Sequence, residues 1–179
     1  MIVLVGESAS GKSSIEKYLV NHYGYKKVVS YTTRQPRQGE IDGVDYHFID
    51  EDKFIELNGN KFFAETAVYN GWHYGTAKED CANDKVAVLT PHGLRQISKI
   101  KNINVVSFYI NVPRRDRLIK ILQRGDNIEE AYRRSLSDVG MFDGISDEVT
   151  FVINNDGYEK SIETMTKEIL LLHTAWQIK

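Results

Sequence analysis

The sequence predicts an α/β protein in which helices cover both faces of a parallel sheet. Apolar runs that suit buried strands alternate with amphipathic stretches that suit helices, and 41% hydrophobic residues in a chain of 179 suffice for one core. We expect strands at Ile2–Val5, Lys27–Ser30, Val86–Thr90, Val105–Asn111 and Val149–Ile153, and helices at Lys12–Tyr23, His92–Lys99, Arg114–Gln123, Ile128–Asp143 and Tyr158–Ile178. Ligands of such sheets bind beyond the carboxyl ends of the strands.

A glycine-rich segment follows the first strand and opens the first helix. Its residues Gly6, Glu7, Ser8, Ala9, Ser10, Gly11, Lys12 and Ser13 fit the pattern G-x-x-x-x-G-K-[ST], and Ser14 continues into the helix. Glycines let backbone N–H groups wrap around phosphate oxygens at a helix N-terminus, whose dipole favours anions. Lys12 would reach the β- and γ-phosphates, and the Ser13 hydroxyl would bind Mg²⁺. The alternative is a flexible turn with a solvated lysine, but the flanking strand and helix favour a phosphate-binding loop.

A charged, aromatic and glycine-rich segment at residues 31–78 interrupts the alternation. Short alternating runs at Asp45–Ile49 and Phe63–Tyr69, the second followed by the turn-forming Asn70-Gly71, predict short strands. One helix is expected near Glu51–Asn58. This segment therefore predicts a small lobe inserted into the parallel core.

Arginines gather at the start of this lobe. Arg34 and Arg37 flank Pro36, which stiffens the loop, so their guanidinium groups can present fixed forks to a dianionic phosphate. The Tyr46 hydroxyl can supply a further donor. The alternative is a charged loop that is only solvated, as charge runs usually are.

The composition limits the partners that the protein can bind and the cellular compartment in which it is expected. A formal net charge of -2 gives no overall attraction to nucleic acid or to an anionic membrane. No stretch approaches the ~20 apolar residues of a membrane span, and the first apolar run is too short for a signal peptide. The one cysteine, Cys81, cannot form an internal disulfide, which fits a reducing compartment. We therefore expect a cytoplasmic protein without a nucleic-acid or membrane partner.

Landmarks over most of the chain resemble those of guanylate kinases. They are the glycine-rich loop, the stretch Thr32-Thr33-Arg34-x-x-Arg37-x-Gly39-Glu40-x-x-Gly43-x-Asp45-Tyr46, then Glu65, Tyr74-Gly75-Thr76, Arg124-Gly125-Asp126 and Val152-Ile153-Asn154-Asn155-Asp156. The resemblance implies a P-loop kinase fold with an inserted lobe that binds a nucleoside monophosphate, and a lid. It also implies that ATP and Mg²⁺ bind at the glycine-rich loop, with Asn155 near the adenine.

The resemblance assigns the acceptor site as well. Arg34, Arg37, Tyr46 and Tyr74 would bind the phosphate of the acceptor nucleotide, and Ser30, Glu65 and Thr76 would recognise its base. This agrees with guanine chemistry, because an ionised Glu65 accepts from the guanine N1 donor. Adenine has an acceptor at N1, and leaving that pair unsatisfied costs roughly 1–3 kcal/mol. The alternative is that Glu65 is an exposed carboxylate on a strand.

A late basic segment is expected to act as a lid. It carries Arg124 and Arg134, and it can fold over the bridging phosphates once both nucleotides bind, which excludes water and brings positive charge to the transferring group. The spacing from Arg124 to the pair Arg133-Arg134 is shorter than usual for the family, and we expect Arg134 to point inward. For the other arginine, the alternative is a position on the helix surface paired with Glu129 or Glu130.

The chain departs from the family pattern at Val88 and Thr90. Aligned through Gly93, these positions replace two aspartates, one near the Mg²⁺ water shell and one that binds the guanine amino group. Loss of the first would weaken the organisation of Mg²⁺, and loss of the second would relax the selectivity for guanine at Thr90. His92 is a candidate substitute ligand, but a histidine at a helix start is more often structural.

These inferences describe one guanylate-kinase-like domain with a core at 1–30, 79–123 and 144–179, an acceptor-binding lobe at 31–78 and a lid at 124–143. The expected reaction is ATP-dependent phosphorylation of GMP or dGMP, with catalytic roles for Lys12, Arg34, Arg124 and Arg134. One alternative is a kinase for another or a modified nucleotide. Another is a catalytically silent binding module, against which the phosphate loop argues; a GTPase is disfavoured because no N-K-x-D motif occurs. The protein is expected to be a monomer or a homodimer.

Overall fold

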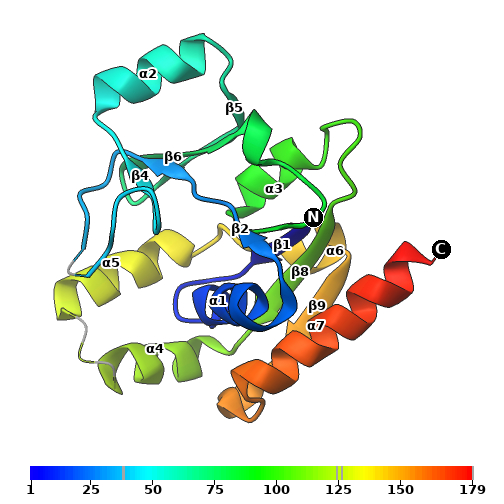
Figure 1. Ribbon diagram of the computed structural model, residues 1–179. Coiled ribbons are helices and arrows are strands. Elements are labelled where there is room, and N and C mark those ends of the chain that lie inside the picture. The colour runs from blue at the N-terminus through cyan, green and yellow to red at the C-terminus, as the bar shows by residue number, and fades with distance from the viewer. Residues whose placement is uncertain (38, 124, 126, 179) are drawn as a thin grey trace.

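The core is a parallel sheet of five strands, as the alternation of apolar runs predicts. The computed structural model describes residues 1–37, 39–123, 125 and 127–178. The strands lie in the order β2-β7-β1-β8-β9, and all the pairs are parallel (Figure 1). Their bounds are β1 Ile2–Val5, β2 Lys26–Lys27, β7 Lys85–Val88, β8 Val106–Asn111 and β9 Phe151–Asn154. The α/β fold class is therefore confirmed.

Helices bury both faces of this sheet because successive side chains of each strand point to opposite sides. Ile2 and Leu4 pack in one apolar cluster with residues of α1 (Lys12–Tyr23) and α7 (Ile162–Gln177). Val3 and Val5 pack in a second cluster with residues of α3 (Pro91–Ile97) and α6 (Ile145–Glu148). Burial of β1 on both faces fixes the start of the loop that follows it.

The inserted segment forms a second sheet above the core. Its four strands lie in the order β4-β3-β6-β5, with bounds β3 Tyr31–Thr32, β4 His47–Phe48, β5 Phe63–Tyr69 and β6 Trp72–Ala77, and α2 covers Glu51–Gly59 (Figure 1). Asn70 and Gly71 join β5 to β6 with φ angles of 56° and 78°. Two successive residues with positive φ match the twist of a tight hairpin, which explains the Asn-Gly sequence.

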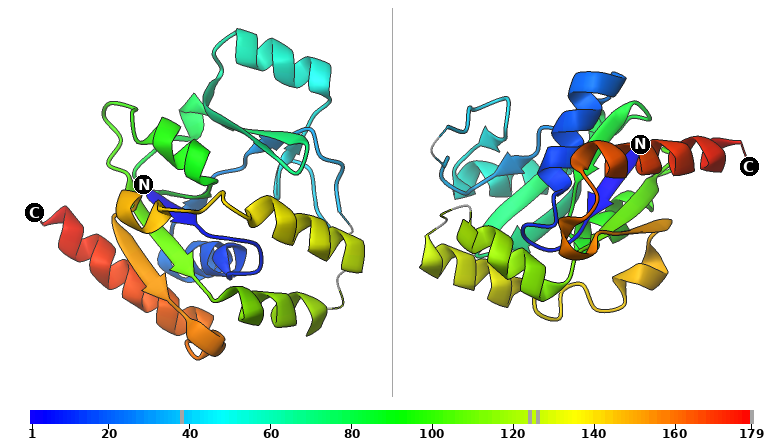
Figure 2. Two further views of the ribbon diagram at one scale, coloured as in Figure 1. Left: turned by 180° about the vertical axis from the view of Figure 1, so that it is seen from behind. Right: turned by 90° about the horizontal axis from the view of Figure 1, so that it is seen from below.

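Two helices, α4 (Arg114–Gln123) and α5 (Ile128–Asp138), lie side by side at one end of the molecule (Figure 2). Short 3₁₀ turns at η1 (Lys78–Asp80) and η2 (Asp156–Tyr158) complete the fold. No helix in the described part of the chain is both long and apolar enough to cross a membrane.

The expected bounds hold for Ile2–Val5, Lys12–Tyr23, Phe63–Tyr69 and Arg114–Gln123, and other bounds differ. The helix expected at Ile128–Asp143 ends at Asp138, shortly before Gly140 with its φ of 76°. The helix expected at Tyr158–Ile178 begins only at Ile162, because the Ser161 side chain caps it.

Two strands of the parallel sheet are shorter than expected or shifted. The strand expected at Val86–Thr90 stops at Val88, because Thr90 is the N-cap of α3 and Pro91 begins that helix. The strand expected at Lys27–Ser30 pairs only over Lys26–Lys27, and the chain then turns toward the inserted lobe.

Candidate active site

A cavity of about 680 Å³ lies between the glycine-rich loop and the inserted lobe. It begins where β1 ends, at the carboxyl edge of the parallel sheet, where such folds bind ligands. Of the predicted site residues, it is lined by Gly6, Ser8, Ala9, Ser10, Gly11, Lys12, Ser13, Ser14, Ser30, Arg34, Arg37, Tyr46, Glu65, Tyr74, Thr90, Arg134 and Asn155. Glu7 and Thr76 do not line it, and Arg124 lies outside the described residues.

The glycine-rich loop needs its glycines for different reasons. A Cβ on Gly6 would lie 2.8 Å from the carbonyl oxygen of Ile110, so no side chain fits there. Gly11 caps α1 in a left-handed conformation with φ 100°. Ala9 also has a positive φ, 65°, although it carries a side chain. The loop therefore encloses its cavity with backbone in conformations that glycine adopts most easily.

Lys12 folds back over this loop. Its Nζ donates to the carbonyl oxygen of Glu7 at 2.7 Å and lies 3.3 Å from the Ser10 Oγ. Burial lowers the pKa of Lys12 to about 8, against the opposing charges of Asp138 and Glu7, while the Arg117 guanidinium lowers it further. A bound phosphate chain would restore the charged form, because its negative charge favours the ammonium group.

The Glu7 side chain serves the scaffold and not the cavity. One carboxylate oxygen lies 3.3 Å from the Arg117 Nη2, and the other accepts from the Tyr109 hydroxyl at 3.0 Å. Arg117 also donates through Nε to the Val112 carbonyl at 3.0 Å. These contacts tie the glycine-rich loop to β8 and α4.

Positive charge converges at the lobe side of the cavity. The Arg34 Nη2 lies 2.9 Å from the Glu40 Oε1, while the second oxygen of Glu40 accepts from the Arg37 backbone N–H at 2.7 Å. The Arg34 guanidinium carbon lies 5.3 Å from the centre of the Tyr46 ring. Burial lowers the pKa of Arg37, and the nearby charges of Arg134 and Arg34 lower it further. Arg34, Arg37 and Arg134 all line this cavity, and their positive charge favours an anion there.

The base-recognition candidates form a hydrogen-bonded chain. The Thr76 hydroxyl donates to the Glu65 Oε1 at 2.7 Å, and the Ser30 hydroxyl lies 3.4 Å from the Thr76 hydroxyl. Glu65 is 4% exposed, and burial raises its pKa to about 7, against the opposing effect of the Thr76 hydrogen bonds. Thr76 thus orients Glu65 from behind, while Glu65 itself faces the cavity.

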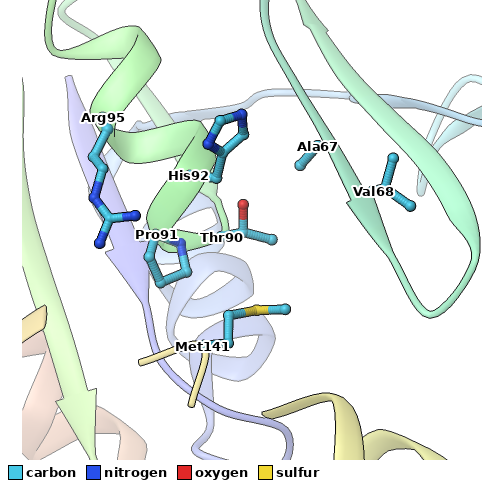
Figure 3. A pocket seen from close by; sticks show the side chains of 7 residues that line it. All are labelled: Ala67, Val68, Thr90, Pro91, His92, Arg95 and Met141. Carbon is cyan, nitrogen blue, oxygen red and sulfur yellow. The ribbon is translucent and has the colours of Figure 1, made fainter. Parts of the chain in front are cut away.

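Thr90 stands between this cavity and a smaller one of about 140 Å³. Figure 3 shows the side chains around the smaller one: Thr90, Pro91, His92 and Arg95 at the start of α3, Ala67 and Val68 on β5, and Met141. The Thr90 Oγ1 accepts from the Gly93 N–H at 3.1 Å, which caps α3. His92 is exposed and does not line the larger cavity, whereas Val88 does.

The opposite end of the cavity lies near the turn after β9. The Asn155 Nδ2 donates to the Lys160 carbonyl, and its Oδ1 accepts from the Lys160 N–H at 2.8 Å, so this buried amide closes the turn. The Tyr158 hydroxyl donates to the Ala9 carbonyl at 2.8 Å, and the Lys120 Nζ lies 5.4 Å from the centre of the Tyr158 ring. A planar heterocyclic ring bound at this end of the cavity would contact the Tyr158 side chain.

The two arginines of α5 have different surroundings. Arg134 lines the cavity, while the Arg133 Nη1 donates to the Asn70 carbonyl at 2.9 Å in the hairpin turn. Arg133 thus contacts the inserted lobe through this donor. The expected pairing with Glu129 or Glu130 stays a prediction, since the Glu130 side chain lies outside the described residues.

Sequence reasoning missed Tyr69, Lys120, Asp138 and Tyr158, all of which line the cavity, and also Arg117. The sequence offered a signal for Tyr69 alone. This residue ends β5, directly before the Asn70-Gly71 turn, and therefore lies at the sheet edge. The other contacts are non-local, and no spacing predicts them.

The donors around the loop fit Mg²⁺ bound together with a phosphate chain. The exposed Ser13 hydroxyl lies at the start of α1, and the cavity is lined there by backbone. In the described part of the chain, no cluster of three or more His, Cys, Asp or Glu side chains is arranged to hold a metal ion by itself. Mg²⁺ commonly takes one or two protein ligands plus substrate phosphates, so this donor set agrees with metal binding through the nucleotide.

Comparisons with known proteins agree with this geometry. The family described as guanylate kinase matches residues 1–171. A guanylate kinase of Trichormus variabilis is 35% identical over 92% of this chain and 86% of its own length, and one of Mycoplasma genitalium is 30% identical over 96% and 75%. A crystal structure of guanylate kinase from Anaplasma phagocytophilum has the same fold, with a TM-score of 0.73 and 23% identity over 100% of this chain and 86% of that one.

Proposed function

The chain belongs to the guanylate kinase family, and we propose that it transfers the γ-phosphoryl group of ATP to GMP or dGMP through the residues of the 680 Å³ cavity. One observation supports this best. A single cavity joins a phosphate-binding loop with its lysine to a cluster of arginines and to the buried Glu65. A nucleoside monophosphate kinase needs this combination, because both phosphate groups must meet in one enclosed space.

The donor phosphates bind backbone N–H groups of the loop at residues 6–14, at the start of α1, other than those of Ser8 and Ser10, which donate to Asp138 and to the Glu7 carbonyl. Lys12 leaves the Glu7 carbonyl and contacts the β- and γ-phosphates, where its charge stabilises the transferring group. Mg²⁺, held by Ser13 and the phosphates, neutralises charge on the phosphate oxygens when it is bound. The adenine lies toward Tyr158 and Lys120, and Asn155 shapes that end by closing the turn beneath it.

The acceptor phosphate binds between Arg34, Arg37 and the hydroxyls of Tyr46 and Tyr74. Guanidinium forks and hydroxyls fix its orientation for in-line attack, and no protein base is needed because the acceptor oxygen is already anionic at neutral pH. Arg134 adds positive charge to the bridging region. We assign 31–78 as the acceptor-binding lobe and 124–143 as the lid, and we retain a catalytic role for Arg124.

Guanine recognition rests on Glu65. Thr76 donates to Oε1 and leaves Oε2 for the N1 donor of guanine, and Ser30 supports the chain behind them. Thr90 contributes a hydroxyl that already accepts from Gly93, so it is a weaker partner for the guanine amino group than a carboxylate would be. This observation keeps a second candidate, a kinase with a broader range of purine acceptors.

The proposal is tested by measuring ADP release with ATP and each common nucleoside monophosphate and deoxynucleoside monophosphate. We expect GMP and dGMP to be the best acceptors, AMP to be poor, and the preference for GMP over IMP to be modest. No ADP release with any acceptor would indicate a silent binding module. Equal rates with AMP and GMP would contradict the role of Glu65.

The remaining assignments follow from the substrates. All the proposed binding groups among the described residues come from one chain, so a monomer suffices for catalysis, and a homodimer would carry two such sites. We propose the cytoplasm as its location, because ATP and GMP are cytoplasmic nucleotides.

A further inference from the structure

One junction of hydrogen bonds connects the phosphate loop, the inserted lobe and α5. It consists of Ser8 in the loop, Tyr69 at the end of β5 and Asp138 at the end of α5. The Asp138 Oδ2 accepts from the Ser8 N–H at 2.9 Å, and its Oδ1 accepts from the Tyr69 hydroxyl at 3.0 Å. The Ser8 Oγ lies 2.9 Å from the Tyr69 hydroxyl oxygen. Three parts of the chain separated by more than 60 residues thus meet at one carboxylate.

The directions of these hydrogen bonds are fixed by their donors. The Tyr69 hydroxyl has one proton, which it gives to Asp138, so the Ser8 hydroxyl must donate to Tyr69. The Ser8 backbone N–H also points at Asp138. The Ser8 N–H and the Tyr69 hydroxyl therefore both donate to the Asp138 carboxylate, and the Ser8 hydroxyl donates to Tyr69. Asp138 is only 7% exposed. Charge-assisted hydrogen bonds shielded from water are strong, so this junction resists opening.

The junction is anchored to the core on one side. The Arg117 Nη1 lies 3.5 Å from the Asp138 Oδ2, and its Nη2 lies 3.3 Å from the Glu7 Oε1. Arg117 is itself 7% exposed and bonds to the Val112 carbonyl after β8. Asp138 is thus held in place relative to the sheet, and whatever it binds is held there as well.

On the other side, the junction holds the acceptor-binding hairpin. Tyr69 and Glu65 line the cavity from the same strand, four residues apart, which is about 13 Å along a strand. The turn of this hairpin also contacts α5, since the Arg133 Nη1 donates to the Asn70 carbonyl and the Ser137 hydroxyl donates to the Asn70 side chain. Figure 2 shows α5 beside this hairpin.

We propose that Tyr69 and Asp138 are positioning residues that hold the acceptor-binding hairpin in register with the phosphate loop. This inference rests on the proposed function, because it concerns the alignment of two phosphate groups in that cavity. Glu65 fixes the base at one end of β5, and the Tyr69–Asp138–Ser8 contacts fix the other end of the strand to the donor loop. A small displacement of one phosphate relative to the other lowers the rate of in-line transfer steeply.

The variant Tyr69→Phe tests this with the least disturbance. It keeps the ring, which contacts Tyr74, and removes only the hydroxyl that bonds to Asp138 and Ser8. Asp138→Asn removes the charge of the junction. Tyr23→Phe and Asp147→Asn are matched controls, since both residues are exposed, lie outside the lid and do not line the cavity.

The first measurement needs no nucleotide. Amide hydrogen exchange of the phosphate-loop peptide should be faster in Tyr69→Phe and in Asp138→Asn than in the wild type, and unchanged in both controls. Melting temperatures identify any variant that is globally destabilised. Exchange of the loop at the wild-type rate in a folded Tyr69→Phe variant would overturn the coupling between hairpin and loop.

The second measurement is kinetic. We expect each variant to lose about tenfold in kcat/KM for GMP, mainly in kcat, with the equilibrium affinity for ATP nearly unchanged. The double variant should lose little more than either single one, because both break the same junction. Multiplicative losses, or wild-type kinetics in Tyr69→Phe, would overturn the inference while the kinase activity of the wild type still stands. A wild type that phosphorylates no nucleotide would instead refute the proposed function, and the exchange measurement would remain decisive for the junction.

Discussion

The two ends of the cavity are built from different materials. At the donor end, one continuous segment at residues 6–14 supplies backbone N–H groups and a single cationic side chain, Lys12. At the acceptor end, the candidate ligands are side chains that come from β5, β6 and the loops around β3 and β4. A contiguous loop presents many equivalent donors, whereas the acceptor end depends on separate side chains, each with its own charge and burial.

The ionisable groups at the two ends also differ in the direction of their pKa shifts. Burial lowers the pKa of Lys12 to about 8 and raises that of Glu65 to about 7. In both cases the cause is the cost of holding a charge away from water, and in both cases the charged form is the one proposed to bind the nucleotide. The donor end is therefore weakened by high pH and the acceptor end by low pH.

The largest effect is expected at the donor end, from Lys12→Ala. The variant removes the donor-loop charge that is proposed to contact the β- and γ-phosphates, so kcat should fall by roughly 10²-fold or more. Steady-state kinetics measure the loss, and circular dichroism confirms that the fold is retained. Lys17→Ala, an exposed lysine on the same helix, is the matched control and should be near wild type. Activity of Lys12→Ala within a few-fold of wild type would contradict the proposed mechanism.

At the acceptor end, Arg34→Ala should impair the use of GMP and not the binding of ATP. Loss of a charge-assisted contact of about 2 kcal/mol corresponds to about 30-fold in kcat/KM for GMP, while the affinity for ATP should change little. Initial rates over a GMP series and ATP binding by calorimetry separate the two effects. Arg115→Ala, an exposed arginine of α4 that does not line the cavity, serves as the control. A selective loss of ATP affinity in Arg34→Ala would mean that the two ends are assigned the wrong way round.

The pH dependence distinguishes the two ends within one protein. At saturating ATP, kcat/KM for GMP should fall by about tenfold per pH unit below about 7, because Glu65 must be ionised to accept from guanine N1. At saturating GMP, kcat/KM for ATP should instead fall above about pH 8, as Lys12 loses its proton next to Asp138, Glu7 and Arg117.

Glu65→Gln supplies the control for the acid limb. The glutamine does not titrate, so any dependence that remains near pH 6 belongs to the phosphate of GMP, whose second pKa is about 6. An acid limb near pH 7 that persists unchanged in Glu65→Gln would refute the role of Glu65.

The contrast between the donor and the acceptor end also explains how much of the site could be predicted from the sequence. The donor loop is local, so its pattern alone predicts both its conformation and its cavity-lining residues, and the strands and helices around it follow from hydrophobic periodicity. The exception is Glu7, whose carboxylate turns to Arg117, a residue more than 100 positions away. No local pattern carries that information.

The acceptor end needed a family resemblance, because its residues are dispersed. Periodicity of β5 could not decide whether Glu65 faces the cavity or solvent, and the structure shows it buried and bonded to Thr76. Asp138 and Tyr69 escaped notice for the same reason, since they meet only through tertiary packing of α5 on the hairpin. The exact end of α5 depended on the chain after Asp138, where Gly140 adopts a positive φ.

The smallest expected effect concerns the backbone of the donor loop. Ala9 has a φ of 65°, in the left-handed region that costs a residue with a Cβ about 1–2 kcal/mol. Ala9→Gly relieves this strain but adds conformational freedom to the unfolded chain, which costs about 0.5–1 kcal/mol. The net result should be a gain of about 0.5–1 kcal/mol in the free energy of unfolding, measured by urea denaturation.

The control is Ala175→Gly, at an exposed position in α7. This variant should instead lose about 1 kcal/mol in the free energy of unfolding, because glycine is unfavourable inside a helix. Opposite signs for the same substitution would show that the donor end depends on backbone conformation, and a loss of stability at both positions would show that Ala9 stores no strain.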